Sequence, residues 1–228
     1  MLASAALLTG LGYLEPIGQA ALDIVGEVTG QVYDARPTPL WLVAILQAFL
    51  WLGLLGAPVL AARTKGNGVV EDFGLRFRLI DVPVGLVIGV VSQLVLVPIV
   101  SLPWIALLGK DLDDLDDSAR ELADKATDPL GVALLFVIVV LGAPVVEELF
   151  FRGLLQRSLL QRVAPVLAVA ISALVFGVTH FQLLQFPALV AFGAILGFLA
   201  LRTGRLGPSI VAHMAFNAVT VIALVLTS

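Results

Sequence analysis

The residues of this chain that could do chemistry gather in its last hundred positions, within or beside stretches that are otherwise apolar. They form three groups: E-E-L-F-F-R with Glu147, Glu148 and Arg152, F-G-V-T-H ending at His180, and H-M-A-F-N with His213 and Asn217. The chain has two histidines and no cysteine, so any catalytic group must be a carboxylate, imidazole, hydroxyl or amide. A charged side chain at mid-bilayer costs at least about 2.5 kcal/mol, so such groups are candidates for function.

Helical spacing divides the tasks that these side chains could perform. Glu148 and Arg152 are four residues apart and share a helix face, which favours a buried ion pair. Glu147 is rotated by about 100° from Glu148 and can point elsewhere. His213 and Asn217 are also four apart, so an imidazole and an amide could address one point. A hydrogen bond that joins two helices explains this last pattern equally well.

The separation between Glu147 and His180 predicts that the two side chains lie level. If they belong to adjacent antiparallel helices, the midpoint falls at residues 163–164, and residues 162–165 read as a turn, R-V-A-P. Counting helical rise from the ends of the apolar stretches puts both Glu147 and His213 in the cytoplasmic half of the bilayer.

The elements that must position these groups are membrane helices. Of the 228 residues, 60% are hydrophobic and 13% charged, with a mean hydropathy of +1.06, whereas soluble domains carry about 25% charged residues. Six charge-free segments approach the roughly 20 residues that cross about 30 Å of hydrocarbon. They are residues 40–62, 82–108, 129–146, 163–179, 183–201 and 206–226. We therefore predict an all-α polytopic membrane helix bundle with about six transmembrane helices and a short N-terminal helix.

The chain divides into three regions on this interpretation. Residues 1–39 are expected to form an interfacial or partial N-terminal helix, and residues 40–128 hold the first two spans and an acidic loop. Residues 129–228 carry the polar groups and form the expected catalytic core. Within the acid-rich run 111–128, the leucine spacing suits an amphipathic surface helix, and a solvated loop fits as well.

The distribution of basic residues predicts the orientation, because cytoplasmic loops carry the excess of lysine and arginine. Nine of the thirteen basic residues fall in three loops on one side, at 63–81, 152–162 and 202–205. These loops are predicted to be cytoplasmic and both termini to be outside.

The three groups together resemble a known family. In this order and on successive apolar helices, E-E-x-x-x-R at 147–152, F-x-x-x-H at 176–180 and H-x-x-x-N at 213–217 are similar to the three motifs of the CAAX protease and bacteriocin-processing family of intramembrane proteases. The resemblance covers roughly residues 130–226, and every motif position matches.

The resemblance implies hydrolysis of a peptide bond within the membrane. By similarity, Glu147 is the general base, His180 helps to hold the attacking water, and His213 with Asn217 forms the oxyanion site. Amide hydrolysis requires both an activated water and a group that stabilises the developing oxyanion, so these roles are chemically complete.

By the same resemblance, Glu148 and Arg152 hold Glu147 and its helix in place. Glu147, His180 and His213 could also supply three ligands to zinc, with water in the fourth position. Because the H-E-x-x-H arrangement is missing, we expect no obligatory cofactor and keep zinc as the alternative. The expected partners are membrane lipid and a peptide or membrane-anchored protein substrate, with no nucleic acid, and the expected location is a bacterial cell membrane that the chain crosses several times.

Other classes of function fit the residues less well. A proton-coupled transporter would use Glu147, Glu148, His180 and His213 as relay groups, yet this does not explain the order and spacing of three motifs. A catalytically silent membrane scaffold or immunity protein would not need complete motifs. A serine protease is disfavoured because Ser209, four residues before His213, lacks the glycine expected after it, and an aspartyl protease because every aspartate precedes residue 129.

Overall fold

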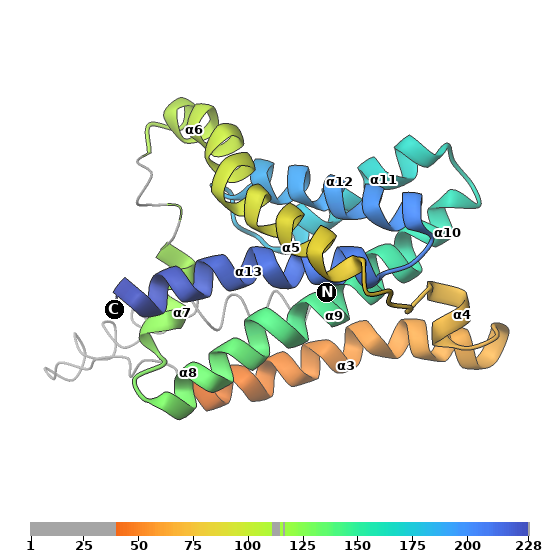
Figure 1. Ribbon diagram of the computed structural model, residues 1–228, viewed down its shortest axis with the longest axis horizontal. Coiled ribbons are helices and arrows are strands. Elements are labelled where there is room, and N and C mark those ends of the chain that lie inside the picture. Colours follow the sequence, from red (N-terminus) through yellow and green to blue (C-terminus); the bar gives the residue numbers. More distant parts are fainter. Residues whose placement is uncertain (1–39, 111–114, 116, 228) are drawn as a thin grey trace, which may run out of the picture.

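The protein is an all-α bundle in the computed structural model, which describes residues 40–110, 115 and 117–227 (Figure 1). Within these ranges every regular element is helical, as the composition predicted. The expected N-terminal helix in residues 1–39 lies outside the described residues.

The helices follow the predicted apolar segments with small shifts at their ends. The first span is α3 (Leu40–Lys65), and the second joins α5 (Asp81–Val91), the π-helical η2 (Ser92–Leu96) and α6 (Val97–Leu107). The third joins α8 (Pro129–Leu135), η4 (Phe136–Gly142), α9 (Ala143–Glu148), η5 (Leu149–Gln156) and α10 (Arg157–Leu160). The remaining long helices are α11 (Pro165–Thr179), α12 (Phe186–Thr203) and α13 (Gly207–Thr227), and α4 (Val69–Phe73) and α7 (Asp117–Asp124) are short.

Five helices in the described part are long and apolar enough to cross a membrane, where we expected about six. The exception is α11, which has 15 residues and covers about 22 Å at 1.5 Å per residue. Its apolar sequence continues a little further toward its start, but Pro165 begins the helix there, because proline suits the first turn and the residue before it avoids helical geometry.

The third span corrects a second expectation. We predicted that it ends at residue 146, whereas the helix runs without a break from Pro129 to Leu160. Arg152, which we assigned to a cytoplasmic loop, is 1% exposed in the interior of the bundle. An arginine in an apolar sequence usually marks the end of a membrane span, because a lone charge is costly in lipid. Here the charge of Arg152 is neutralised inside the protein by Glu148, so the helix can continue past it.

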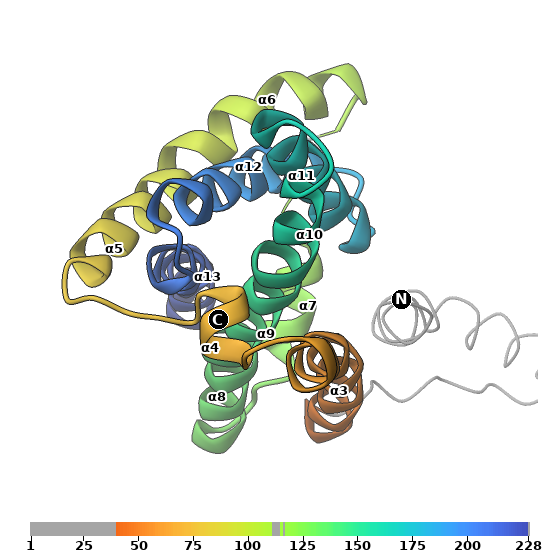
Figure 2. The ribbon, with the colours of Figure 1, turned by 90° about the vertical axis from the view of Figure 1, so that its right-hand side faces the viewer.

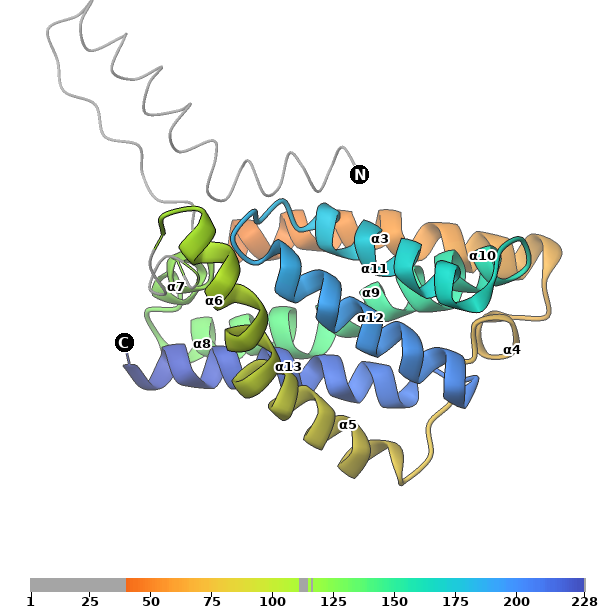
Figure 3. The ribbon, with the colours of Figure 1, turned by 90° about the horizontal axis from the view of Figure 1, so that it is seen from above.

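Small residues let two of the helices approach closely. Gly85 and Gly89 lie one turn apart on α5, and a Cβ atom at either position would meet the backbone of α13 at Ala212 at less than 3 Å. Such glycine pairs are a common basis of close helix packing in membranes. Figure 3 shows α5 crossing α13, while Figure 2 shows α3 beside α8 and α9, away from α5 and α6.

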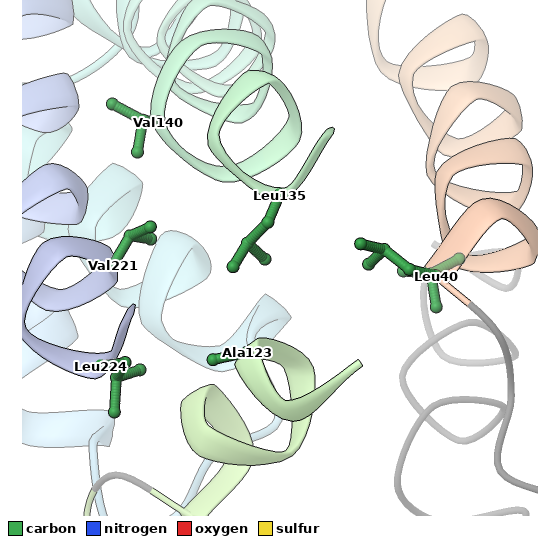
Figure 4. Close-up of a cluster of buried hydrophobic side chains, with 7 residues drawn as sticks. Leu40, Ala123, Leu135, Val140, Val221 and Leu224 are labelled. Atoms are coloured by element: carbon green, nitrogen blue, oxygen red, sulfur yellow. The ribbon is translucent and has the colours of Figure 1, made fainter. Parts of the chain in front are cut away.

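The acid-rich segment forms a helix where it is described. In α7, Ala123 is buried and Leu122 is partly buried, and both pack into an apolar cluster at one end of the bundle. Figure 4 shows this cluster, which includes Leu40, Leu135 and Leu224 from three spans. Of the two alternatives for residues 111–128, the amphipathic helix is therefore correct over 117–124.

The basic loops meet at the opposite end of the bundle. Arg157 donates hydrogen bonds to the carbonyl oxygens of Asp72 (3.1 Å) and Gly204 (2.7 Å). Arg205 pairs with Asp81, and this carboxylate raises the pKa of the Arg205 guanidinium above its usual value. Because Arg152 lies in the interior, eight basic residues rather than nine remain at this end. The predicted orientation is based on these eight.

Cysteine substitutions test this orientation, since the natural chain has no cysteine. Asn67→Cys lies at the basic end and Thr127→Cys at the end of α7, and both positions are exposed. In sealed vesicles, an impermeant thiol reagent should label the two from opposite sides, with Asn67→Cys reached from the cytoplasmic side. Labelling of both from one side would contradict the topology.

Candidate active site

Three helices bring the carboxylate and the two imidazoles predicted for the site to one point. Glu147 comes from α9, His180 from the end of α11 and His213 from the middle of α13. The Oε2 atom of Glu147 lies 3.9 Å from Nε2 of His180 and 3.9 Å from Nε2 of His213. These distances exceed a direct hydrogen bond and suit a bridging atom, such as a water oxygen.

The level placement of Glu147 and His180 follows from the turn between their helices. The third span ends at Leu160 and α11 begins at Pro165, so the turn lies close to the predicted residues 162–165. Phe181 then takes a positive φ of 55° and turns the chain away immediately after His180. A positive φ is unusual for a bulky residue, and such strained positions are often found at functional sites.

The hydrogen bond made by His180 determines which of its two ring nitrogens can accept a hydrogen bond near Glu147. Its Nδ1 lies 2.7 Å from the carbonyl oxygen of Phe176, one turn earlier in α11. A carbonyl can only accept, so Nδ1 carries the hydrogen. In the neutral ring Nε2 is then an acceptor, and it points at the buried Oε2 of Glu147, which has no hydrogen-bond partner. A water between them could donate one hydrogen to each.

His213 is held by the ion pair, a contact that the sequence analysis missed. Its Nδ1 lies 3.1 Å from Oε1 of Glu148, and the same oxygen accepts a hydrogen bond from Arg152 at 2.8 Å. The side chains of Glu148 and Arg152 are completely buried. The predicted pair on one helix face is thus present, and it also orients a histidine from a different helix.

Arg152 is surrounded by groups that suit a buried cation. Its second terminal nitrogen donates to the carbonyl oxygen of Gly193 in α12 at 2.9 Å. Its guanidinium carbon lies 4.5 Å from the ring centre of Phe176, within the range of a cation–π contact. The same ring lies 4.6 Å from that of His180. The phenylalanine of F-x-x-x-H therefore links the ion pair to the histidine.

Asn217 lies in the same site but does not act with His213 as simply as the spacing suggested. Its amide nitrogen donates to the carbonyl oxygen of Val139 in η4 at 2.8 Å, which joins α13 to the third span. Pro144 follows five residues after Val139 and has no N–H to offer the preceding turn. The carbonyl of Val139 in the π-helical turn is therefore available to Asn217. The result is a hydrogen bond that joins two helices, which was the alternative explanation of the spacing.

The site opens into a cavity of about 540 Å³, which we call the chamber. Glu147, His180, His213 and Asn217 line it, and so do apolar side chains from α3, α6, α7, α8 and α12. Four glutamines also line the chamber: Gln47, Gln93, Gln182 and Gln185. The sequence analysis did not name them, although Gln47 and Gln93 interrupt apolar spans and could have been noticed for that reason.

The zinc alternative finds no preformed site in the described part of the chain. No group of three histidine, cysteine, aspartate or glutamate side chains there has an arrangement that could hold a metal ion. Zinc ligands lie about 2.0–2.2 Å from the metal and, at tetrahedral angles, about 3.3–3.6 Å from one another. The two 3.9 Å separations of Glu147 from His180 and His213 would therefore shorten slightly if the three side chains held a zinc ion.

Comparisons with known proteins match the segment of the chain that carries these motifs. Residues 129–219 match the family model described as "Type II CAAX prenyl endopeptidase Rce1-like". The protein named "Putative membrane peptidase YdiL" from Bacillus subtilis (strain 168) is 31% identical over 91 residues, which are 40% of this chain and 37% of that relative. The resemblance to the CAAX protease and bacteriocin-processing family is confirmed over this segment.

The matched family segment spans the helices that carry all three motifs, from α8 into α13. The relative is bacterial, and the long apolar helices make this chain a multi-pass membrane protein. No solved structure matches the chain significantly.

The buried pair of this family segment should be sensitive to the loss of one partner. Arg152→Met leaves the carboxylate of Glu148 buried without its cation and should lower the free energy of unfolding by about 3–5 kcal/mol. The double variant with Glu148→Gln should recover much of this loss, because the uncompensated charge is gone. Denaturation in detergent, followed by circular dichroism, measures both.

The exposed Arg202 supplies the matched control for this substitution. Its guanidinium lies over Phe198 at the surface, so Arg202→Met should change the free energy of unfolding by no more than about 0.5 kcal/mol. A double variant as unstable as Arg152→Met alone would contradict the role given to the ion pair.

Proposed function

We propose that this protein is an intramembrane endopeptidase in which Glu147 and His180 activate a water that hydrolyses a peptide bond. The observation that carries the proposal is the Oε2 atom of Glu147, which is buried, has no hydrogen-bond partner and lies 3.9 Å from Nε2 of both histidines. A general base and a second acceptor on either side of one water are what amide hydrolysis requires.

The reaction follows from the positions of the hydrogens. Water donates one hydrogen to Glu147 and the other to Nε2 of His180, which leaves an oxygen lone pair for the peptide carbonyl carbon. As the C–O bond forms, Glu147 takes the proton and the carbonyl oxygen becomes an oxyanion. Collapse of the tetrahedral intermediate breaks the C–N bond, and the proton on Glu147 passes to the leaving amine nitrogen.

His213 and Asn217 are the proposed donors to the oxyanion. Because Glu148 accepts from Nδ1 of His213, the ring can carry a second hydrogen on Nε2 as an imidazolium. Asn217 uses one amide hydrogen for Val139 and has another to donate.

The chamber suits an extended peptide better than a hydrocarbon chain. Its walls are mainly apolar, but the amides of Gln47, Gln93, Gln182 and Gln185 can each donate to and accept from a peptide backbone. A purely apolar occupant would leave the buried Oε1 of Gln93, which has no partner, without one. A peptide or a membrane-anchored protein with an apolar segment is the substrate class that we propose.

The decisive variant is Glu147→Gln, which replaces the base by an amide of the same shape. Loss of general-base help should slow cleavage by about 100-fold or more. Cleavage is measured by mass spectrometry, with wild-type and variant protein in liposomes and a library of membrane-anchored peptides. Glu71→Gln removes an exposed carboxylate at the basic end and should leave the rate unchanged.

Four outcomes would redirect the proposal. Undiminished cleavage by Glu147→Gln would contradict the mechanism. Inhibition by a chelator, reversed by zinc, would assign the water to a metal held by Glu147, His180 and His213. Absence of cleavage together with Glu147-dependent proton flux would favour the transporter, and absence of both would favour a scaffold.

A further inference from the structure

A row of buried polar atoms without partners follows one side of the third span. In the described part of the chain, the unpartnered buried side-chain atoms include Oε2 of Glu148, Nε of Arg152 and Oε1 of Gln156. These residues are four apart and occupy one side of α9 and η5. Their exposed fractions are 0%, 1% and 1%. Glu147, whose Oε2 also has no partner, directly precedes the row in the chain and lies at the proposed site of hydrolysis.

The far end of the row meets a second cavity, of about 300 Å³, which we call the polar pocket. Arg152 and Gln156 line it, together with Arg157, Gly204 and Asp72 from the basic end. The row thus extends from the chamber, which Glu147 lines, to a pocket at the opposite end from α7.

Glycines of α12 fix the orientation of the row. Arg152 donates to the carbonyl oxygen of Gly193, and Gln156 donates to that of Gly197 at 2.9 Å, so the same offset of 41 residues repeats one turn later. Since the amide nitrogen of Gln156 faces Gly197, its oxygen must be the free acceptor. A Cβ atom at Gly197 would lie 2.5 Å from this oxygen, so a larger residue would crowd it.

Water is the ligand that these atoms can share. The row contains both acceptors, on Glu148 and Gln156, and a donor on Arg152, and buried water typically makes about three hydrogen bonds to such groups. A substrate that fills the chamber displaces the water in it and covers its mainly apolar walls. Hydrolysis in a filled chamber therefore requires water from another direction.

We propose that hydrolytic water reaches Glu147 from the polar pocket along Gln156, Arg152 and Glu148, separately from the substrate. Gln156 is a positioning residue on this route, outside the three motifs. The effect of this route on the rate of cleavage rests on the proposed function. The presence of water along the row can be measured independently of any peptidase activity.

Two neighbouring leucines provide a matched test of the route. Leu159 and Leu160 are both half-buried in α10, and only Leu160 lines the polar pocket. In the cysteine-free chain, Leu160→Cys and Leu159→Cys are each labelled with a small charged methanethiosulfonate reagent in liposomes, and the extent of labelling is measured by mass spectrometry.

Labelling of Leu160→Cys should slow cleavage at least about tenfold, because general-base catalysis operates only on a water that is in place. Peptide binding, measured with Glu147→Gln added, should not change, and a reducing agent should restore the rate. Labelled Leu159→Cys should cleave normally. Full labelling of Leu160→Cys with no change in rate would overturn the proposal.

Radiolytic footprinting tests for the water itself and separates failure of the route from failure of the proposed function. Short X-ray pulses turn bound water into hydroxyl radicals that oxidise adjacent side chains. Phe151 is 3% exposed, lies beside the guanidinium of Arg152 and does not line the chamber, so its oxidation reports water in the row. Phe176 also contacts this guanidinium but lines the chamber, so its oxidation reports water on either side.

We expect Phe151 to be oxidised in the wild type and less so in Gln156→Met, while Gln156→Glu, which keeps an oxygen acceptor, should restore the oxidation. This result would support the route even if no peptide is cleaved. Absence of oxidation at Phe151 in a folded wild-type protein would overturn it, whatever the peptidase activity.

Discussion

The interior of this bundle is organised around one buried ion pair, between Glu148 and Arg152. Two charges taken out of water are costly unless each finds further partners, so the surrounding helices must supply them. α13 supplies His213 to the carboxylate, α12 supplies the carbonyl of Gly193 to the guanidinium, and α11 supplies the ring of Phe176. The pair therefore sets the positions of three helices relative to the third span, and it holds one of the two histidines directly.

The remaining geometry depends on departures from regular helix packing. The π-helical turns and Pro144 free backbone carbonyls in the third span, and side chains of neighbouring helices use them: Asn217 bonds to Val139, and Ser172 bonds to Phe151. Broken regularity of this kind is tolerated in membranes only where other groups satisfy the backbone. Such π-helical turns are frequent at functional sites, because they change which side chains face the interior.

The site separates apolar from polar surroundings within a short distance. On one side of Glu147 lies the mainly apolar chamber, which α7 helps to line. On the other side lies the buried pair of Glu148 and Arg152, followed by the polar pocket at the basic end. A carboxylate at this boundary faces the chamber and still lies next to the hydrogen-bonded groups of Glu148, Arg152 and His213. The low dielectric of the interior strengthens these interactions and penalises any group left unpaired.

The amino-acid sequence by itself determined the helical class, the six apolar segments and the set of candidate residues that the structure brings together. Hydropathy sets which segments can lie in lipid, and two histidines and two adjacent glutamates in apolar surroundings leave few other candidates. The nearly equal spacing of Glu147 and His180 from a turn at 161–164 also made their level placement predictable, since an antiparallel hairpin aligns such residues.

Only the tertiary structure decided which partners the polar groups have. The sequence suggested that Arg152 lies in a loop, because nothing in it shows that the guanidinium donates a hydrogen bond to the carbonyl of Gly193, 41 positions away. The contact of His213 with Glu148 and that of Asn217 with Val139 join residues that are 65 and 78 positions apart. Local spacing shows which side chains share a helix face, but the rotation of one helix against another depends on packing, as where glycines of α5 meet α13. Contacts between helices therefore do not follow from periodicity alone.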